Sequence, residues 1–168
     1  EPLGTGYLYE GWVIVNGMPV STGTFSVAED GSLSQNQFEL DADELMNASR
    51  FVLSIEPSPD NDPAPAATKL LVGDFSNRTA SLSTNIVGDF SDAAGTFFLR
   101  TPTDETGSNN GNDQYGVWFG IPGMPPMTGF MLPDLPEGWQ YEGWVVSENG
   151  PLTTGTFTSF DMADNAVP

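Results

Sequence analysis

One segment of this chain occurs twice. The 18 residues "YEGWVIVNGMPVSTGTFS" at 9–26 align without a gap with "YEGWVVSENGPLTTGTFT" at 141–158. Each copy contains an aromatic and β-branched run, an Asn-Gly turn signal and a second run rich in Thr, which is the pattern of a β-hairpin. The sequence therefore predicts one hairpin over residues 7–27 and another over residues 139–160. We expect the hairpins to have turns of equal length and different type, because the Asn-Gly pair lies one residue later in the second copy.

The rest of the chain favours the same fold class. The 19 glycines and 14 prolines are scattered between short apolar runs, which is typical of short strands joined by tight turns. We expect further strands near residues 37–40, 51–55, 69–74, 79–84, 95–101, 115–120 and 129–132. One short helix is expected near residues 41–49, since Asp41 can cap a helix and Glu44 can reach back to its start.

The two halves of the chain carry related strands in permuted order. We therefore predict an all-β protein in which residues 1–168 form a single antiparallel β-sandwich domain with an internal pseudo-duplication. In such a sandwich, two related sheets face each other and bury both sets of aromatic side chains in one core.

The repeated pentapeptide is interpreted as architecture rather than as a reactive site. Neighbouring residues of a strand face opposite sides, so Glu10 shares a face with Trp12. A carboxylate there needs hydrogen-bond partners at the sheet rim, or it acts as a cation ligand. Gly11 is explained if a ring from a neighbouring strand covers the missing side chain. The structural residues of the repeat are Tyr9, Glu10, Gly11 and Trp12, and Tyr141, Glu142, Gly143 and Trp144.

The charge of the chain limits its partners. Four Lys and Arg residues stand against 23 Asp and Glu residues, which gives a net charge of −19. Such a surface repels phosphates and anionic lipids, so we expect no nucleic-acid partner. No apolar run is long enough to span a bilayer, and we expect no membrane insertion by this segment. A cation or a basic protein is the natural partner, although an acidic surface is also typical of proteins from salty or extracellular habitats.

The side chains that carry most enzyme chemistry are absent. The chain contains no His and no Cys, and neither a nucleophile-elbow nor a phosphate-loop motif occurs. A glycosidase needs only two carboxylates, but the sequence does not nominate a pair among 23. We predict that the protein is not an enzyme, that it has no catalytic residues, and that it binds no organic cofactor.

Calcium is the candidate metal, because its ligands are oxygen atoms and two loops are rich in Asp and Asn. Neither loop matches the spacing of an EF-hand. The alternative is that these side chains only bond their own backbone in turns. The calcium candidates are Asp60, Asp62, Asp104, Asn109 and Asp113.

Three segments together resemble a known family. These are "YEGWVIVNGMPVSTGTF", "FVLSIEPSPDNDPAPAATKLLVGDF" and "GWQYEGWVVSENGPLTTGTF". They are similar to the C-terminal, extracytoplasmic domain of the anti-sigma-K factor family, over about residues 7–75 and again over the terminal hairpin. The resemblance implies a β-sandwich outside the cytoplasmic membrane of a prokaryote (periplasmic, cell-surface or secreted), in a family that restrains a sigma factor from the other side. The membrane helix and the cytoplasmic sigma-binding domain are not recognised in these residues.

The expected function is that of a non-catalytic, extracytoplasmic interaction or sensor domain with a protein partner. One alternative is a self-assembling surface or fibre subunit that forms homo-oligomers through its strand edges. The other alternative is a cation- or carbohydrate-binding module.

Overall fold

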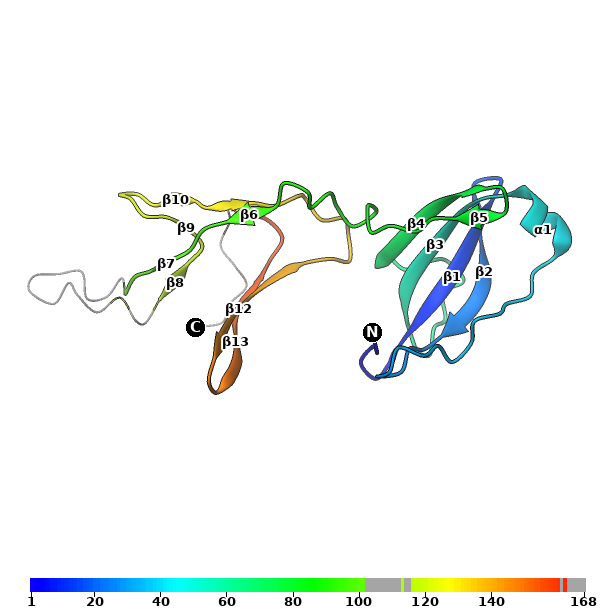
Figure 1. The fold of residues 1–168 in the computed structure, drawn as a ribbon, viewed down its shortest axis with the longest axis horizontal. Coiled ribbons are helices and arrows are strands. Elements are labelled where there is room, and N and C mark those ends of the chain that lie inside the picture. Colours follow the sequence, from blue (N-terminus) through cyan, green and yellow to red (C-terminus); the bar gives the residue numbers. More distant parts are fainter. Residues whose placement is uncertain (102–112, 114–115, 161, 163–168) are drawn as a thin grey trace, which may run out of the picture. The chain divides into compact units, whose positions relative to one another are not determined.

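The computed structural model describes residues 1–101, 113, 116–160 and 162 (Figure 1). Every strand pairing in this part of the chain is antiparallel, and one short helix interrupts the strands. The prediction of an all-β fold with one short helix is confirmed. The chain divides into two compact units, Glu1–Gly88 with Pro136–Trp139, and Asp89–Leu135 with Gln140–Pro168. The predicted hairpins lie in different units, so a sandwich with one shared core stays a prediction.

Unit 1 contains a five-stranded sheet in the order β2-β1-β3-β4-β5. Its strands are β1 (Tyr7–Val15), β2 (Met18–Phe25), β3 (Ala48–Pro57), β4 (Lys69–Ser76) and β5 (Thr79–Ala80). Because β1 pairs with β2 on one edge and with β3 on the other, it is an interior strand of the sheet. Residues 9–13 of β1 are buried on both faces of the strand, which agrees with the apolar side chains that both faces carry.

Helix α1 (Ala42–Asn47) lies between β2 and β3 in the chain and begins where the sequence predicts. Asp41 caps it, since its carboxylate accepts a hydrogen bond from the backbone N–H of Asp43 at 2.8 Å. The strand expected at residues 37–40 is wrong, because that segment joins no ladder. Its apolar character serves side-chain packing instead: the Phe38 ring lies 6.0 Å from that of Phe25, centroid to centroid.

The described residues of unit 2 form four two-stranded ladders. Strand β6 (Ala94–Gly95) pairs with β11 (Phe130–Met131), β7 (Phe98–Leu99) with β8 (Val117–Trp118), and β9 (Gly120–Ile121) with β10 (Met127–Thr128). The fourth ladder joins β12 (Tyr141–Ser147) to β13 (Gly150–Phe157). The strands predicted at 95–101 and 115–120 are thus each divided into short pieces.

The buried apolar side chains of the described residues all lie in unit 1. They come mainly from the two central strands, with Tyr9, Trp12 and Val13 on β1, and Val52 and Leu53 on β3. Unit 2 buries its aromatic rings less completely, and these rings stack on one another instead. The core of the described structure therefore sits where β1 and β3 meet.

Candidate functional site

The two hairpins have the same register. Tyr9 lies opposite Phe25, and Tyr141 lies opposite Phe157. The paired rings stack in both copies, with centroids 5.5 and 5.3 Å apart. In both copies a β-bulge follows the glycine of the repeated pentapeptide. The duplication seen in the sequence is therefore a duplication of backbone geometry.

The turns of the two hairpins differ as predicted. Both hairpins are closed by two-residue loops. In the first loop, Asn16 and Gly17 have φ angles of 50° and 82°, the left-handed values that a tight hairpin turn requires. In the second copy, the left-handed residue is Gly150, with φ of 105°, and it follows the loop. The hairpins thus keep one register with two turn types.

The glycines of the pentapeptide are covered by rings, as expected. A Cβ atom on Gly11 would lie 3.0 Å from the Phe51 ring, and one on Gly143 would lie 3.1 Å from the Phe119 ring. A Cβ atom at either position would also collide with the hydroxyl oxygen of a neighbouring threonine, Thr22 for Gly11 and Thr154 for Gly143. Both glycines are therefore required by the close approach of a side chain.

Each carboxylate of the pentapeptide accepts a hydrogen bond from a hydroxyl group of its own hairpin. Ser21 Oγ donates to Glu10 Oε1 and accepts from the backbone N–H of Gly23 at 3.1 Å. In the second copy, Thr153 Oγ1 donates to Glu142 Oε1 at 2.7 Å. Glu10 has only 8% of its surface exposed, so this partner offsets part of the cost of burying a carboxylate.

The copies differ sharply in what surrounds them. Trp12 is 2% exposed, whereas its counterpart Trp144 is 51% exposed. Val146 and Leu152 are also exposed, at 79% and 66%, while their counterparts in the first copy are partly buried. The second hairpin therefore presents to solvent an apolar surface that the first hairpin covers. Trp144 and Val146 share one face of β12, and we call these two residues the open hairpin face; Leu152 lies opposite Val145 and belongs to the other face.

The strand β3 accounts for the difference. It pairs along the whole of β1, and the indole N–H of Trp12 donates to Ser54 Oγ at 2.8 Å. The Ser54 hydroxyl in turn donates to the carboxylate of Glu56, which accepts the backbone N–H of Ala66 at 2.9 and 3.2 Å to its two oxygens. Within the described residues, β12 pairs with β13 alone.

The buried carboxylate of Glu56 is a site residue that sequence reasoning missed. It is 2% exposed, and Ser54 beside it is fully buried. Through Ala66 it fixes the proline-rich loop that joins β3 to β4. The available signal was its position on the same face of the strand as Ser54, at the end of an apolar run and just before Pro57. A carboxylate there needs donors from the loop that follows.

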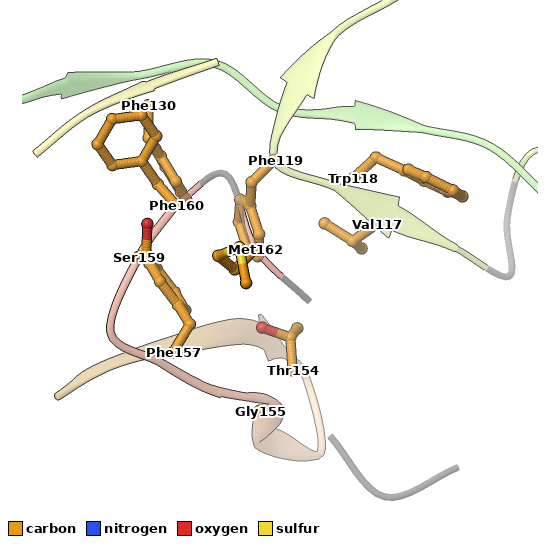
Figure 2. Close-up of a pocket in the computed structure, with 10 residues that line it drawn as sticks. All are labelled: Val117, Trp118, Phe119, Phe130, Thr154, Gly155, Phe157, Ser159, Phe160 and Met162. Atoms are coloured by element: carbon orange, nitrogen blue, oxygen red, sulfur yellow. The ribbon is translucent and has the colours of Figure 1, made fainter. Parts of the chain in front are cut away.

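Unit 2 also contains an aromatic cavity of about 330 Å³ (Figure 2). Its wall includes stacked rings, with centroids 5.0 Å apart for Phe119 and Phe130 and 5.9 Å apart for Phe130 and Phe157. Figure 2 shows the hydroxyl groups of Thr154 and Ser159 at the same cavity. Among the described residues that line it, no side chain is a carboxylate or an amine, so the cavity suits an uncharged apolar group rather than acid–base chemistry. Its lining residues are Val117, Trp118, Phe119, Phe130, Thr154, Gly155, Phe157, Ser159, Phe160 and Met162.

Two of the calcium candidates are engaged in turns. The Asp60 carboxylate accepts the backbone N–H of Asp62 at 2.9 Å, and the Asp62 carboxylate accepts that of Ala64 at 3.0 Å. Asp104 and Asn109 lie outside the described residues, and Asp113 is exposed. Among the described residues no group of three or more acidic side chains is placed to hold a metal ion. Calcium binding stays a prediction.

Comparison of the chain with protein-family models, curated proteins and solved structures gave no match. In the part of the chain that the structure describes, no helix has the length and apolar character needed to cross a membrane. The fold and the site thus define a class, an antiparallel β protein with a duplicated hairpin. One copy is covered by a third strand, and the other copy has an open face.

Proposed function

We propose that this chain is a non-catalytic interaction or sensor domain that binds a partner protein through the open hairpin face. The observation that carries the proposal is the contrast between Trp12, at 2% exposure, and Trp144, at 51%. The register, the bulge and the carboxylate contact are the same in both hairpins, so the second differs mainly in lacking a cover. An exposed aromatic and aliphatic surface on a folded hairpin is typical of an interaction site.

The resemblance to the anti-sigma-K factor domain supports the same class of function and an extracytoplasmic location. Both are part of the proposal. The net charge of −19 favours a basic or neutral partner over an acidic one. The alternative with a structural observation behind it is a self-assembling subunit, because a free strand edge also serves to pair copies of one chain.

Light scattering after size-exclusion chromatography separates these functions. Samples are measured over a range of protein concentrations. The buffer has an ionic strength of about 0.15 M, so that surface charges are screened as in physiological conditions. A monomer at all concentrations supports an interaction domain. Open-ended growth with concentration overturns it in favour of a structural subunit.

The role of the open hairpin face is tested by retention of a partner. The full chain is immobilised, and proteins retained from extracts of its source cells are identified, purified and rebound by calorimetry. The double variant Trp144→Ser/Val146→Ser should lose the partner. The matched control Met124→Ser/Met127→Ser removes two exposed apolar side chains of the same unit, at 92% and 63%, and should retain it. Equal binding by both double variants would show that the open hairpin face is not the site.

A further inference from the structure

The first hairpin shows what the second one lacks. Strand β1 has partners on both edges, and its second partner β3 covers Trp12. In the described residues β12 has a partner on one edge only. A strand edge with unpaired backbone groups beside an exposed apolar face is a template for the addition of a further strand.

The backbone groups that face the free edge can be assigned. In an antiparallel strand, the N–H and C=O of one residue point to one edge and those of the next residue to the other. Ile14 lies opposite Pro19, which has no N–H, and its carbonyl oxygen accepts a hydrogen bond from Ser49 at 3.1 Å. The Ile14 backbone therefore points away from β2 and towards β3. Its counterpart Val146 lies opposite Pro151 and points to the free edge of β12 in the same way.

The backbone N–H groups of β3 that face β1 can be assigned from the pairing of β3 with β4. Val72 exchanges backbone hydrogen bonds with Ser83, each at 3.0 Å, so its N–H and C=O point away from β3. Val52 lies opposite Val72 on one side and Trp12 on the other. The N–H of Val52 therefore faces β1, and the N–H of its neighbour Phe51 faces β4.

The chemistry of β3 defines what the free edge accepts. Opposite Trp12 stands the aliphatic Val52, and Ser54 supplies an oxygen to the indole N–H. The second hairpin already has the Phe119 ring over Gly143, so a partner need not supply that ring. What remains to be supplied is an extended segment with an aliphatic residue opposite Trp144 and a small hydroxyl residue two positions later.

Charge selects between a second copy of this chain and a different protein. Residues 133–160, which include the second hairpin, contain four Asp and Glu residues and no Lys or Arg. A second copy brings its own net charge of −19 to this surface. In unit 1 the strand beside the first hairpin carries Arg50 opposite Ile14, and the guanidinium of Arg50 pairs with Asp74 of β4. A strand flanked by basic residues is therefore the complementary occupant.

We propose that the free edge of β12 binds an extended segment of a partner protein by antiparallel strand addition, and that this segment has the chemistry of β3: aliphatic, with a small hydroxyl residue for Trp144 and a basic flank. This proposal rests on the proposed function and specifies how the partner is held. Main-chain hydrogen bonds give the affinity, and the alternate side chains give the specificity.

The test uses the sequence of β3 as a synthetic probe. The peptide SRAVLSIEP, residues 49–57 with Ala at the Phe51 position because the Phe119 ring already covers Gly143, is titrated into the full chain while amide signals are followed by NMR. We expect saturable binding with the largest changes at Trp144 and Val146, and a shift of tryptophan emission to shorter wavelength. Two N-methylated peptides give the matched control. Methylation at the Val52 position removes an N–H that faces the hairpin and should weaken binding at least about tenfold, or about 1.4 kcal/mol. Methylation at the Phe51 position removes an N–H on the other edge and should leave binding nearly unchanged.

Failure of this proposal is distinct from failure of the proposed function. If the unmodified peptide does not bind, or if the two methylated peptides bind equally, strand addition is overturned. In that case, a purified partner that still depends on Trp144 and Val146 leaves the proposed function standing. If the peptides behave as expected and no partner is retained by the immobilised chain, the edge accepts strands but the interaction-domain function fails.

Discussion

The strongest prediction compares the two tryptophans of the repeat, because their local sequences and strand positions are the same. Replacing Trp12 by Ala removes a side chain that is 2% exposed and leaves a cavity between β1 and β3. A buried Trp removes roughly 150–250 Å² from water. At about 25 cal/mol per Å² this area corresponds to about 4–6 kcal/mol, close to the range of about 3–5 kcal/mol measured for such truncations. We expect the free energy of unfolding of unit 1 to fall by about 3–5 kcal/mol.

The same substitution at position 144 should cost much less. Trp144 is 51% exposed, so it removes only about half of its surface from water, and its truncation leaves no closed cavity. We expect a loss of at most about 2–3 kcal/mol, which is half of the area term for a fully buried Trp. The milder change Trp12→Phe keeps most of the volume and removes the indole hydrogen bond to Ser54, and it should cost about 1–2 kcal/mol.

Urea unfolding followed by far-UV circular dichroism measures these losses, and amide hydrogen exchange assigns each to its unit. With a urea slope of about 1–3 kcal/mol/M, the Trp12→Ala change lowers the midpoint by at least about 1 M. Since typical domains are stable by only about 5–15 kcal/mol, this loss is a large fraction of the stability of unit 1. Equal losses for the Ala variants at positions 12 and 144 would refute the reasoning, because the two hairpins would then be covered alike.

Three further predictions concern single contacts. Replacing Glu56 by Gln places an N–H₂ group among the donors that now surround the carboxylate, so the free energy of unfolding should fall by about 1–3 kcal/mol. The loop at residues 58–68 should then be cleaved faster by a protease, as followed by mass spectrometry. Unchanged cleavage would contradict the role of Glu56 in holding this loop. Replacing Gly143 by Ala forces a Cβ to within 3.1 Å of the Phe119 ring and should destabilise unit 2 by about 1–3 kcal/mol in the same urea assay, with no effect if the ring moves freely. The hydrogen bond from Arg50 lowers the pKa of the Asp74 carboxyl group, so the contribution of this pair to stability is present above the pKa of the unfolded chain and is lost as the pH falls through the lowered value. In an NMR titration, Arg50→Ala should raise the pKa of Asp74 towards its ordinary value, and an unchanged pKa would exclude the contact in solution.

Local features of the fold could be predicted from the sequence because nearby residues set them. Asn16-Gly17 specifies its own turn, and Asp41 caps α1 through a backbone N–H two residues away. The repeat also predicted a ring over Gly11, since an interior glycine beside aromatics needs a filler. These contacts depend on few residues, and both copies of the hairpin therefore show the same register.

Long-range features could not be predicted in the same way. Trp12 and Trp144 have the same neighbours in sequence, and their exposure differs because β3 adds to only one of the hairpins. The burial of Glu56 depends on the N–H of Ala66, which a loop brings back ten residues later. No periodicity in the sequence encodes either contact. For this reason the sequence predicts the repeated motif but not the exposure of its tryptophans. The structure shows that Trp144, in the second copy, is the exposed one.

The acidic side chains near the free edge of β12 affect which strands can pair with it. An exposed apolar face next to an unpaired strand edge favours pairing with any extended chain, including another copy, unless charge opposes it. The second hairpin carries Glu142 and Glu148 and no cation, so copies of the chain repel one another there while a basic segment is attracted. The affinity for the peptide SRAVLSIEP with added flanking lysines should fall as the salt concentration rises, because the Debye length shrinks from about 10 Å at 0.1 M to about 3 Å at 1 M. The unflanked peptide is the control, and its affinity should depend less on salt. An affinity for the flanked peptide that rises with salt would show that apolar burial alone selects the partner.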